Sequence, residues 1–187
     1  LGRNYTYNEE RGVYKTADGG KNWEKILYIS EKIGVVELVM DPSDNQTLYA
    51  VTWERDRKAW NNVIAGKGSG IYKTTDGGLT WIHSLNISEN TGAVDVEFDP
   101  RDQDIRYAAA YQRRRSVWAL LAGGEDSGIY KSTDAGETWR EVTNGLPTGD
   151  MGKIDIAVSP LDPDVVYATI EANQEDRGFY RSLNSGE

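Results

Sequence analysis

The 187-residue chain contains no cysteine and only one histidine, His83. Without cysteine the protein can form neither a disulfide nor a thiolate metal site. A single histidine leaves almost no material for a histidine metal site or for a histidine-based catalytic triad. We therefore expect no metal site and no cofactor.

The sequence also lacks a long apolar segment and an excess of basic residues. No apolar run approaches the roughly 18–20 residues that a membrane helix needs. The net charge of −9 disfavours a general nucleic-acid binder, because such proteins neutralise phosphates with a broad basic surface. We therefore expect a packed globular protein that neither inserts into membranes nor binds nucleic acid.

What the chain does contain is one motif in three copies, followed by a partial fourth copy. The copies span residues 13–23, 71–81 and 129–139, and the partial copy spans 179–187. Asp18, Asp76 and Asp134 follow one another at a period of 58 residues. A fixed period of this size indicates a solenoid, a propeller or another array of one repeated unit. The unfinished last copy and the lack of an initial Met predict a segment of a longer polypeptide.

Each period contains four short strand candidates, rich in Val, Ile, Tyr and Trp. The first strands are residues 35–40, 93–98 and 153–158, each followed by a turn with proline, and the second are centred on Tyr49, Tyr107 and Tyr167. The third strand is the Ile-Tyr-Lys element, and the fourth begins at the tryptophan of the motif. Four antiparallel strands per repeat predict an all-β fold, a β-propeller present as an incomplete set of about three blades.

The predicted blades divide the chain into four segments. They are 1–26 (second half of a blade), 27–84 (a blade), 85–142 (a blade) and 143–187 (an incomplete blade). A ring of blades needs about four or more, so this chain would not close a ring alone. We therefore expect the remaining blades of the same protein, or further copies of the chain, as partners.

The aspartate of each motif is predicted to hold the turn between the third and fourth strands. Aspartate accepts hydrogen bonds from turn amides, glycine adopts positive φ, and tryptophan can fill the gap between stacked sheets. The residues with this predicted structural role are Asp18, Gly20, Trp23, Asp76, Gly78, Trp81, Asp134, Gly136 and Trp139. In the last copy Asn184 replaces the aspartate.

The pattern Ser/Thr-x-Asp-x-Gly-x-Thr-Trp resembles the Asp-box, or bacterial neuraminidase repeat, of sialidases, sortilin-type receptors and two-propeller xyloglucanases. Over the whole chain the sequence is most similar to bacterial sortilin-like Asp-box proteins, many of them labelled glycosyl hydrolases. The resemblance implies a propeller and an extracytoplasmic location (secreted, periplasmic or cell-surface). It does not extend to the sialidase site, since no Tyr–Glu nucleophile pair can be assigned here.

Two basic loops between second and third strands carry the candidate ligand-binding residues. In a propeller such loops lie on the rim opposite the motif turns, and loops of adjacent blades are neighbours. Guanidinium groups bind carboxylate or sulfate, and indole faces cover sugar rings. The candidates are Arg55, Arg57, Trp60, Arg113, Arg114 and Trp118. In the alternative interpretation, the arginines pair with nearby carboxylates and the tryptophans fill gaps between blades.

Three acidic residues occupy one position in the first strands of successive repeats. Glu37, Asp95 and Asp155 each lie three residues after an aligned glycine. Because the first strand of a blade is nearest the axis, we expect them at the mouth of the central channel, as candidate catalytic residues of a glycoside hydrolase. Alternatively, each acid satisfies loop amides or a rim arginine.

Three hypotheses for function follow. The leading one is recognition of a glycan or an extended polypeptide on the loop rim opposite the motif turns. The alternatives are a glycoside hydrolase, if the protein is an enzyme, and a structural scaffold in a larger assembly. Fold alone does not decide among them.

Overall fold

The computed structural model describes residues 3, 5–63 and 65–187 of the chain. These residues are all-β: they form no helix, and so none long and apolar enough to cross a membrane. The strands in chain order are β1 (Val13–Lys15), β2 (Glu24–Leu27), β3 (Ile33–Met40), β4 (Leu48–Glu54), β5 (Asp56–Lys58), β6 (Asn61–Val63), β7 (Gly70–Thr74), β8 (Ile82–Leu85), β9 (Gly92–Phe98), β10 (Arg106–Tyr111), β11 (Arg113–Ser116), β12 (Leu120–Ala122), β13 (Gly128–Ser132), β14 (Arg140–Val142), β15 (Ile154–Val158), β16 (Val166–Ile170) and β17 (Gly178–Ser182).

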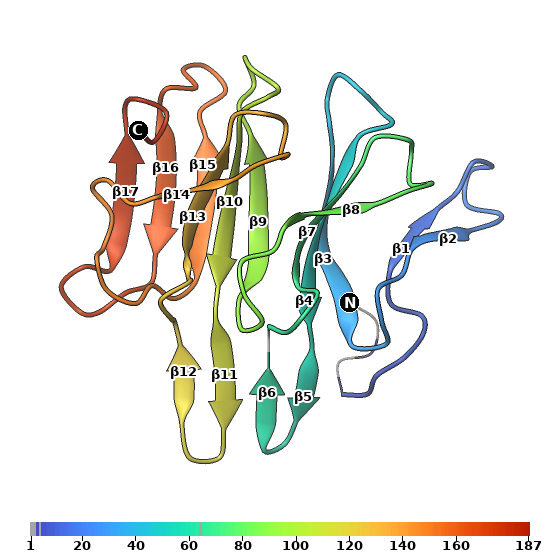
Figure 1. The fold of residues 1–187 in the computed structure, drawn as a ribbon, viewed down its shortest axis with the longest axis horizontal. Helices are drawn as coiled ribbons and strands as arrows, with labels where there is room; N and C mark the ends of the chain where they lie inside the picture. The colour runs from blue at the N-terminus through green and yellow to red at the C-terminus, as the bar shows by residue number, and fades with distance from the viewer. Residues whose placement is uncertain (1–2, 4, 64) are drawn as a thin grey trace.

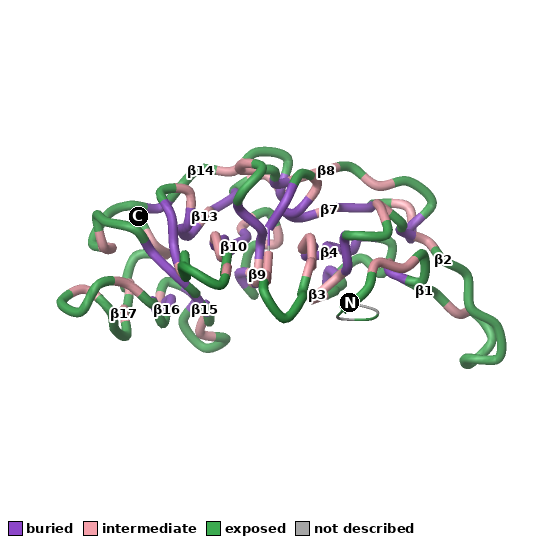
Figure 2. Tube along the Cα trace, turned by 90° about the horizontal axis from the view of Figure 1, so that it is seen from below, coloured by how far each residue is buried: buried purple, intermediate pink, exposed green. Residues whose placement is uncertain are grey.

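Most of these strands form the antiparallel sheets of a β-propeller. Two of the blade sheets have four strands, in the orders β3-β4-β7-β8 and β9-β10-β13-β14. A three-stranded sheet, β15-β16-β17, lies on one side of them, and the pair β1-β2 lies on the other (Figure 1). Seen along the strands, the sheets fan out from β3, β9 and β15, which lie together on one side of the fan (Figure 2). The prediction of four-stranded blades is therefore confirmed.

The fourth strand of each repeat begins just after the motif tryptophan, not at it. Trp81 precedes β8 and Trp139 precedes β14. The indole of Trp81 donates a hydrogen bond to the Ile26 carbonyl (2.8 Å), and that of Trp139 donates to Ser84 Oγ (3.1 Å). Each acceptor lies on or beside the last strand of the preceding sheet. Trp81 and Trp139 therefore each link two sheets.

The hydrophobic core lies between neighbouring sheets rather than within one of them. One cluster joins Tyr49, Val51 and Ile71 of the β3-β4-β7-β8 sheet to Val96 and Ala108 of the β9-β10-β13-β14 sheet. A second cluster joins the β9-β10-β13-β14 sheet to β15 and β16. Since each sheet is only one layer thick, its apolar side chains can be buried only by the next sheet, which makes stacking the main source of stability.

Polar contacts that recur at the same position in each repeat also join the sheets. The Tyr49 hydroxyl donates to the Ala135 carbonyl (2.7 Å), as the Tyr107 hydroxyl does to the Ser185 carbonyl (2.9 Å). The lysine of the Tyr-Lys element likewise contacts the motif turn of the next repeat. Lys73 pairs with Glu137 and Lys131 pairs with Glu187, each at 2.6 Å.

The structure differs from the prediction in the two basic loops, which are β-hairpins. Strands β5 and β6 form one hairpin, and β11 and β12 form the other. The hairpins come from neighbouring sheets and pair with each other through β6 and β11, which gives a separate four-stranded sheet in the order β12-β11-β6-β5. Asn and Arg have no marked strand propensity, so this cross-sheet pairing decides the local structure.

Candidate functional site

The paired hairpins enclose a groove at the end of the molecule opposite the motif turns. The groove has a volume of about 850 Å³, and its lining includes Arg57, Trp60, Asn62, Arg115 and Trp118. Both indoles face solvent, since Trp60 is 64% and Trp118 is 90% exposed. The structure thus brings together three residues predicted from the two loops, Arg57, Trp60 and Trp118.

The strand register separates the predicted arginines between the two faces of the hairpin sheet. Arg57 pairs with Asn62, and Asn62 pairs in turn with Arg115, so these three side chains form one row on one face. Arg113 lies two residues before Arg115 in β11 and therefore shares its face. Arg55 precedes β5 and lies close enough to Arg57 and Arg113 for their charges to act on it. Arg114 pairs with Val63 and Leu121 and lies on the opposite face.

Sequence reasoning therefore missed Arg115 and included Arg114. Three consecutive arginines give no internal sign of which one points toward the groove. The alternation of side chains along a strand would have separated them once the hairpin register was known. Arg55 and Arg113 are half-buried behind the groove and do not line it.

The arginines of the groove face have no carboxylate partners within the described part of the chain. None of Arg55, Arg57, Arg113 and Arg115 forms a salt bridge there, although the chain carries a net charge of −9. The Arg57 guanidinium lies 5.2 Å from the ring of Tyr5. Burial, together with the like charges of Arg57, Arg113 and Arg11, lowers the pKa of Arg55. The groove face thus gathers several arginines that no salt bridge neutralises within the described residues.

The three predicted channel acids lie in the innermost strands, β3, β9 and β15, and two of them hydrogen-bond to the next sheet. Glu37 accepts a hydrogen bond from the Val96 amide (3.3 Å), and Asp95 accepts one from the Ile156 amide (2.9 Å). Val96 directly follows Asp95, and Ile156 directly follows Asp155, so each acid bonds beside the equivalent acid of the next sheet. Two of the three carboxylates therefore have a structural partner, whereas Asp155 is exposed.

Burial and mutual repulsion perturb the acids of these inner strands. Burial raises the pKa of Asp95, and burial with the nearby charge of Asp95 raises that of Glu37. The largest effect is at Glu97, which the sequence analysis did not select. Burial first, and then the charges of Asp95, Glu37 and Asp155, raise the pKa of Glu97 to about 7. Its position two residues after Asp95 in a predicted inner strand could have indicated it.

The motif aspartates accept hydrogen bonds within their own turns. Asp134 accepts from Ser132 Oγ (2.8 Å), the Thr138 amide (2.8 Å) and the Thr138 hydroxyl (2.5 Å). Asp76 makes the same set with Thr74 and Thr80, and Asp18 makes an equivalent set with Thr16 and Asn22. These bonds lower the pKa of Asp134 to about 2. The glycines two residues further on, Gly20, Gly78 and Gly136, all have positive φ.

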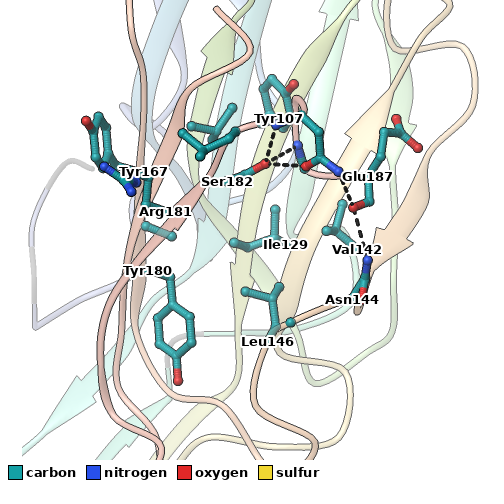
Figure 3. A pocket seen from close by; sticks show the side chains of 16 residues that line it. Tyr107, Ile129, Val142, Asn144, Leu146, Tyr167, Tyr180, Arg181, Ser182 and Glu187 are labelled. Carbon is teal, nitrogen blue, oxygen red and sulfur yellow. Dashed lines mark hydrogen bonds between the residues drawn. The ribbon is translucent and has the colours of Figure 1, made fainter.

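A second pocket, of about 490 Å³, lies between β10, β13 and β14 on one side and β16 and β17 on the other (Figure 3). Tyr107, Ile129, Val142, Leu146 and Tyr180 are among its apolar lining. At the equivalent position between the β3-β4-β7-β8 and β9-β10-β13-β14 sheets, the space is filled by the indole of Trp139. We therefore assign this pocket to packing between sheets and not to ligand binding.

Comparison with known proteins agrees with this architecture. No protein-family model matches the chain. The chain is 23% identical over 184 residues to a probable oligoxyloglucan-reducing end-specific xyloglucanase of Neosartorya fischeri, with 95% of this chain and 19% of that protein covered. It is 27% identical over 148 residues to the photosystem II assembly protein Ycf48 of Thermosynechococcus vestitus, with 69% of this chain and 41% of that protein covered. The chain thus spans less than half the length of either curated relative.

A solved structure shows the same fold. The GH74 xyloglucanase from Xanthomonas campestris superimposes with a TM-score of 0.68 at 18% sequence identity, covering 97% of this chain and 27% of that one. At this level of identity the match concerns the fold. The chain therefore has the structure of β-propeller blades and is similar in sequence to xyloglucanases and to a photosystem II assembly protein.

Proposed function

We propose that this protein recognises an extended ligand, a glycan or a polypeptide, in the groove between the two hairpins. The observation that carries the proposal is the convergence of two exposed tryptophans with Arg57 and Arg115. These residues come from the two hairpins that extend from adjacent blades. Large exposed aromatic side chains in a groove with few polar anchors are typical of a recognition surface. The similarity to xyloglucanases favours a glycan as the ligand.

The experiment compares glycan binding by the 187-residue chain and by a Trp60→Ala/Trp118→Ala variant, with xyloglucan and other plant and bacterial oligosaccharides as probes. We expect the double variant to lose binding while its urea unfolding midpoint is nearly unchanged, because both indoles are exposed. Trp23→Ala is the matched control: Trp23 is 60% exposed but lies in a motif turn. Equal binding by wild type and double variant would contradict the proposal, and a broad protein interface without glycan affinity would favour a scaffold.

A second candidate function is glycoside hydrolysis by the acids of the inner strands. It is favoured by the similarity to xyloglucanases and by the pKa of about 7 for Glu97, a value suited to a general acid. In this case Glu97→Gln and Asp155→Asn would each lower the release of reducing sugar from xyloglucan oligosaccharides by orders of magnitude. Asp162→Asn, at an exposed turn, is the control and would leave the rate unchanged.

We also propose the context in which the groove acts. The motif turns are Asp-boxes, and the protein resembles bacterial sortilin-like proteins in its overall sequence pattern. It acts outside the cytoplasm. The division into blades at residues 26, 84 and 142, and the completion of the ring by other blades or copies, belong to the same proposal. The mass of the intact source polypeptide, measured denatured and then native, tests the last of these.

A further inference from the structure

We infer that the ligand of the hairpin groove is an acidic polysaccharide, whose uronate carboxylates are bound by Arg57 and Arg115. The inference rests on the proposed ligand-binding role of the groove and specifies the chemical class of ligand. It starts from the charge of the groove face. Arg57, Arg113 and Arg115 share that face, and Arg55 lies near them. None of these four arginines forms a salt bridge in the described residues, although the net charge of the chain is −9.

The arrangement of these arginines indicates that the missing counter-charge comes from a ligand. Burial lowers the pKa of Arg55, and the like charges of Arg57 and Arg113 lower it further, because like charges placed together repel one another. The buried Nε atoms of Arg55 and Arg113 also lack hydrogen-bond partners. A bound anion would relieve this repulsion. Arginine forms paired, parallel hydrogen bonds with a carboxylate, which makes a carboxylate well matched to the site.

The register of the sheet sets the spacing of the two arginines that line the groove. Arg57 lies on β5 and Arg115 on β11, with Asn62 of β6 between them. Two inter-strand steps separate their backbones by about 10 Å. This spacing allows each arginine to bind a separate carboxylate along an extended polymer.

The remaining lining favours a polysaccharide over an acidic polypeptide. Trp60 and Trp118 present wide apolar faces to solvent, which suit the flat faces of sugar rings. Asn62, which lies between Arg57 and Arg115 in the same row, adds an amide group that suits sugar hydroxyls. A polypeptide bound by strand addition would instead need pockets for alternate side chains.

Isothermal titration calorimetry with oligogalacturonate and its fully methyl-esterified form tests the inference. The two probes share the same sugar chain and differ in the methyl ester, which removes the charge of each carboxyl group. We expect the wild-type chain to bind the acidic form at least about tenfold more tightly, and added salt to reduce the difference. Arg57→Gln/Arg115→Gln should abolish the preference. Arg114→Gln should retain it, because Arg114 lies on the opposite face of the sheet.

Each contrary outcome has a distinct meaning. Equal affinity for the two forms would overturn the acidic-ligand inference and leave the groove as a site for neutral glycans, provided that Trp60→Ala/Trp118→Ala removes binding. Unchanged binding in that tryptophan variant would overturn the proposed groove itself. Polyglutamate binding as tightly as oligogalacturonate, and through Arg57 and Arg115, would show that the ligand is an acidic polypeptide and overturn the assignment to a polysaccharide.

Discussion

The Arg106 guanidinium of one sheet forms a buried salt bridge with Asp41 of the preceding sheet, with Nη2 and Oδ2 2.8 Å apart. Arg106 is 1% and Asp41 is 7% exposed. The guanidinium also lies against the rings of Tyr49 and Phe98, at 4.7 and 4.9 Å. This contact fastens β10 to the proline turn that follows β3, and it therefore joins the two complete four-stranded sheets.

Breaking this pair should destabilise the stack of sheets strongly. Asp41→Ala leaves the Arg106 charge buried without its partner, and we expect a loss of about 3–5 kcal/mol in the free energy of unfolding. Urea denaturation measures it. Replacing both residues, as Asp41→Leu with Arg106→Met, should restore part of the loss because no charge then remains buried. Arg140→Ala, at the Arg140–Glu187 pair in which both side chains are exposed, is the control and should change stability far less. An equal loss in that control would contradict the prediction.

The motif aspartates should make stability depend on acid pH. The pKa of Asp134 is lowered from 3.8 to about 2, so its ionised form stabilises the fold fully above about pH 4. That contribution is lost as the pH falls through about 2. Asp134→Asn should therefore lower the urea midpoint at pH 6, and its difference from wild type should shrink toward pH 2. A difference that stays constant over this range would show that charge is not responsible. Asn184 occupies the same position in the last copy.

Glu97 should produce the opposite pH dependence near neutrality. Its pKa is raised from 4.5 to about 7, so burial favours the protonated form in the folded state. The contribution of protonated Glu97 to the free energy of unfolding is fully present below about pH 4.5. It is lost as the pH rises through about 7. Glu97→Gln should therefore raise the unfolding midpoint at pH 8 and change it little at pH 4. Glu89→Gln, at an exposed site, is the control, and the same gain at both pH values in Glu97→Gln would contradict the assignment.

The cross-sheet pairing of the hairpins should be needed for the groove but not for the blades. Asn62→Pro removes a backbone N–H from the central strand β6 and should separate the hairpins. We expect binding of glycan probes to be lost while most of the unfolding free energy remains, because the main sheets do not depend on β6. Asn62→Ala keeps the N–H and should retain more binding. Global unfolding of the proline variant would show that the hairpin sheet supports the blades.

Local sequence accounts for the repeated part of this fold. The spacing of Asp18, Asp76 and Asp134 predicts one unit per 58 residues, and the Tyr-Lys and Asp-Gly elements place the third strand and the turn after it. These features are readable because the hydrogen bonds that fix each turn run between residues two to four positions apart, as at Asp134 and Thr138.

The candidate site depends on contacts between residues that lie far apart in the chain and whose pairing no sequence pattern predicts. Arg57 and Arg115 share a face only because β6 pairs with β11 across two sheets, and a shift of one residue in that register would have placed Arg114 there instead. Glu97 owes its raised pKa to burial and to carboxylates on other strands. Both effects follow from the stacking of sheets, since pairing register and desolvation arise only when distant segments pack together.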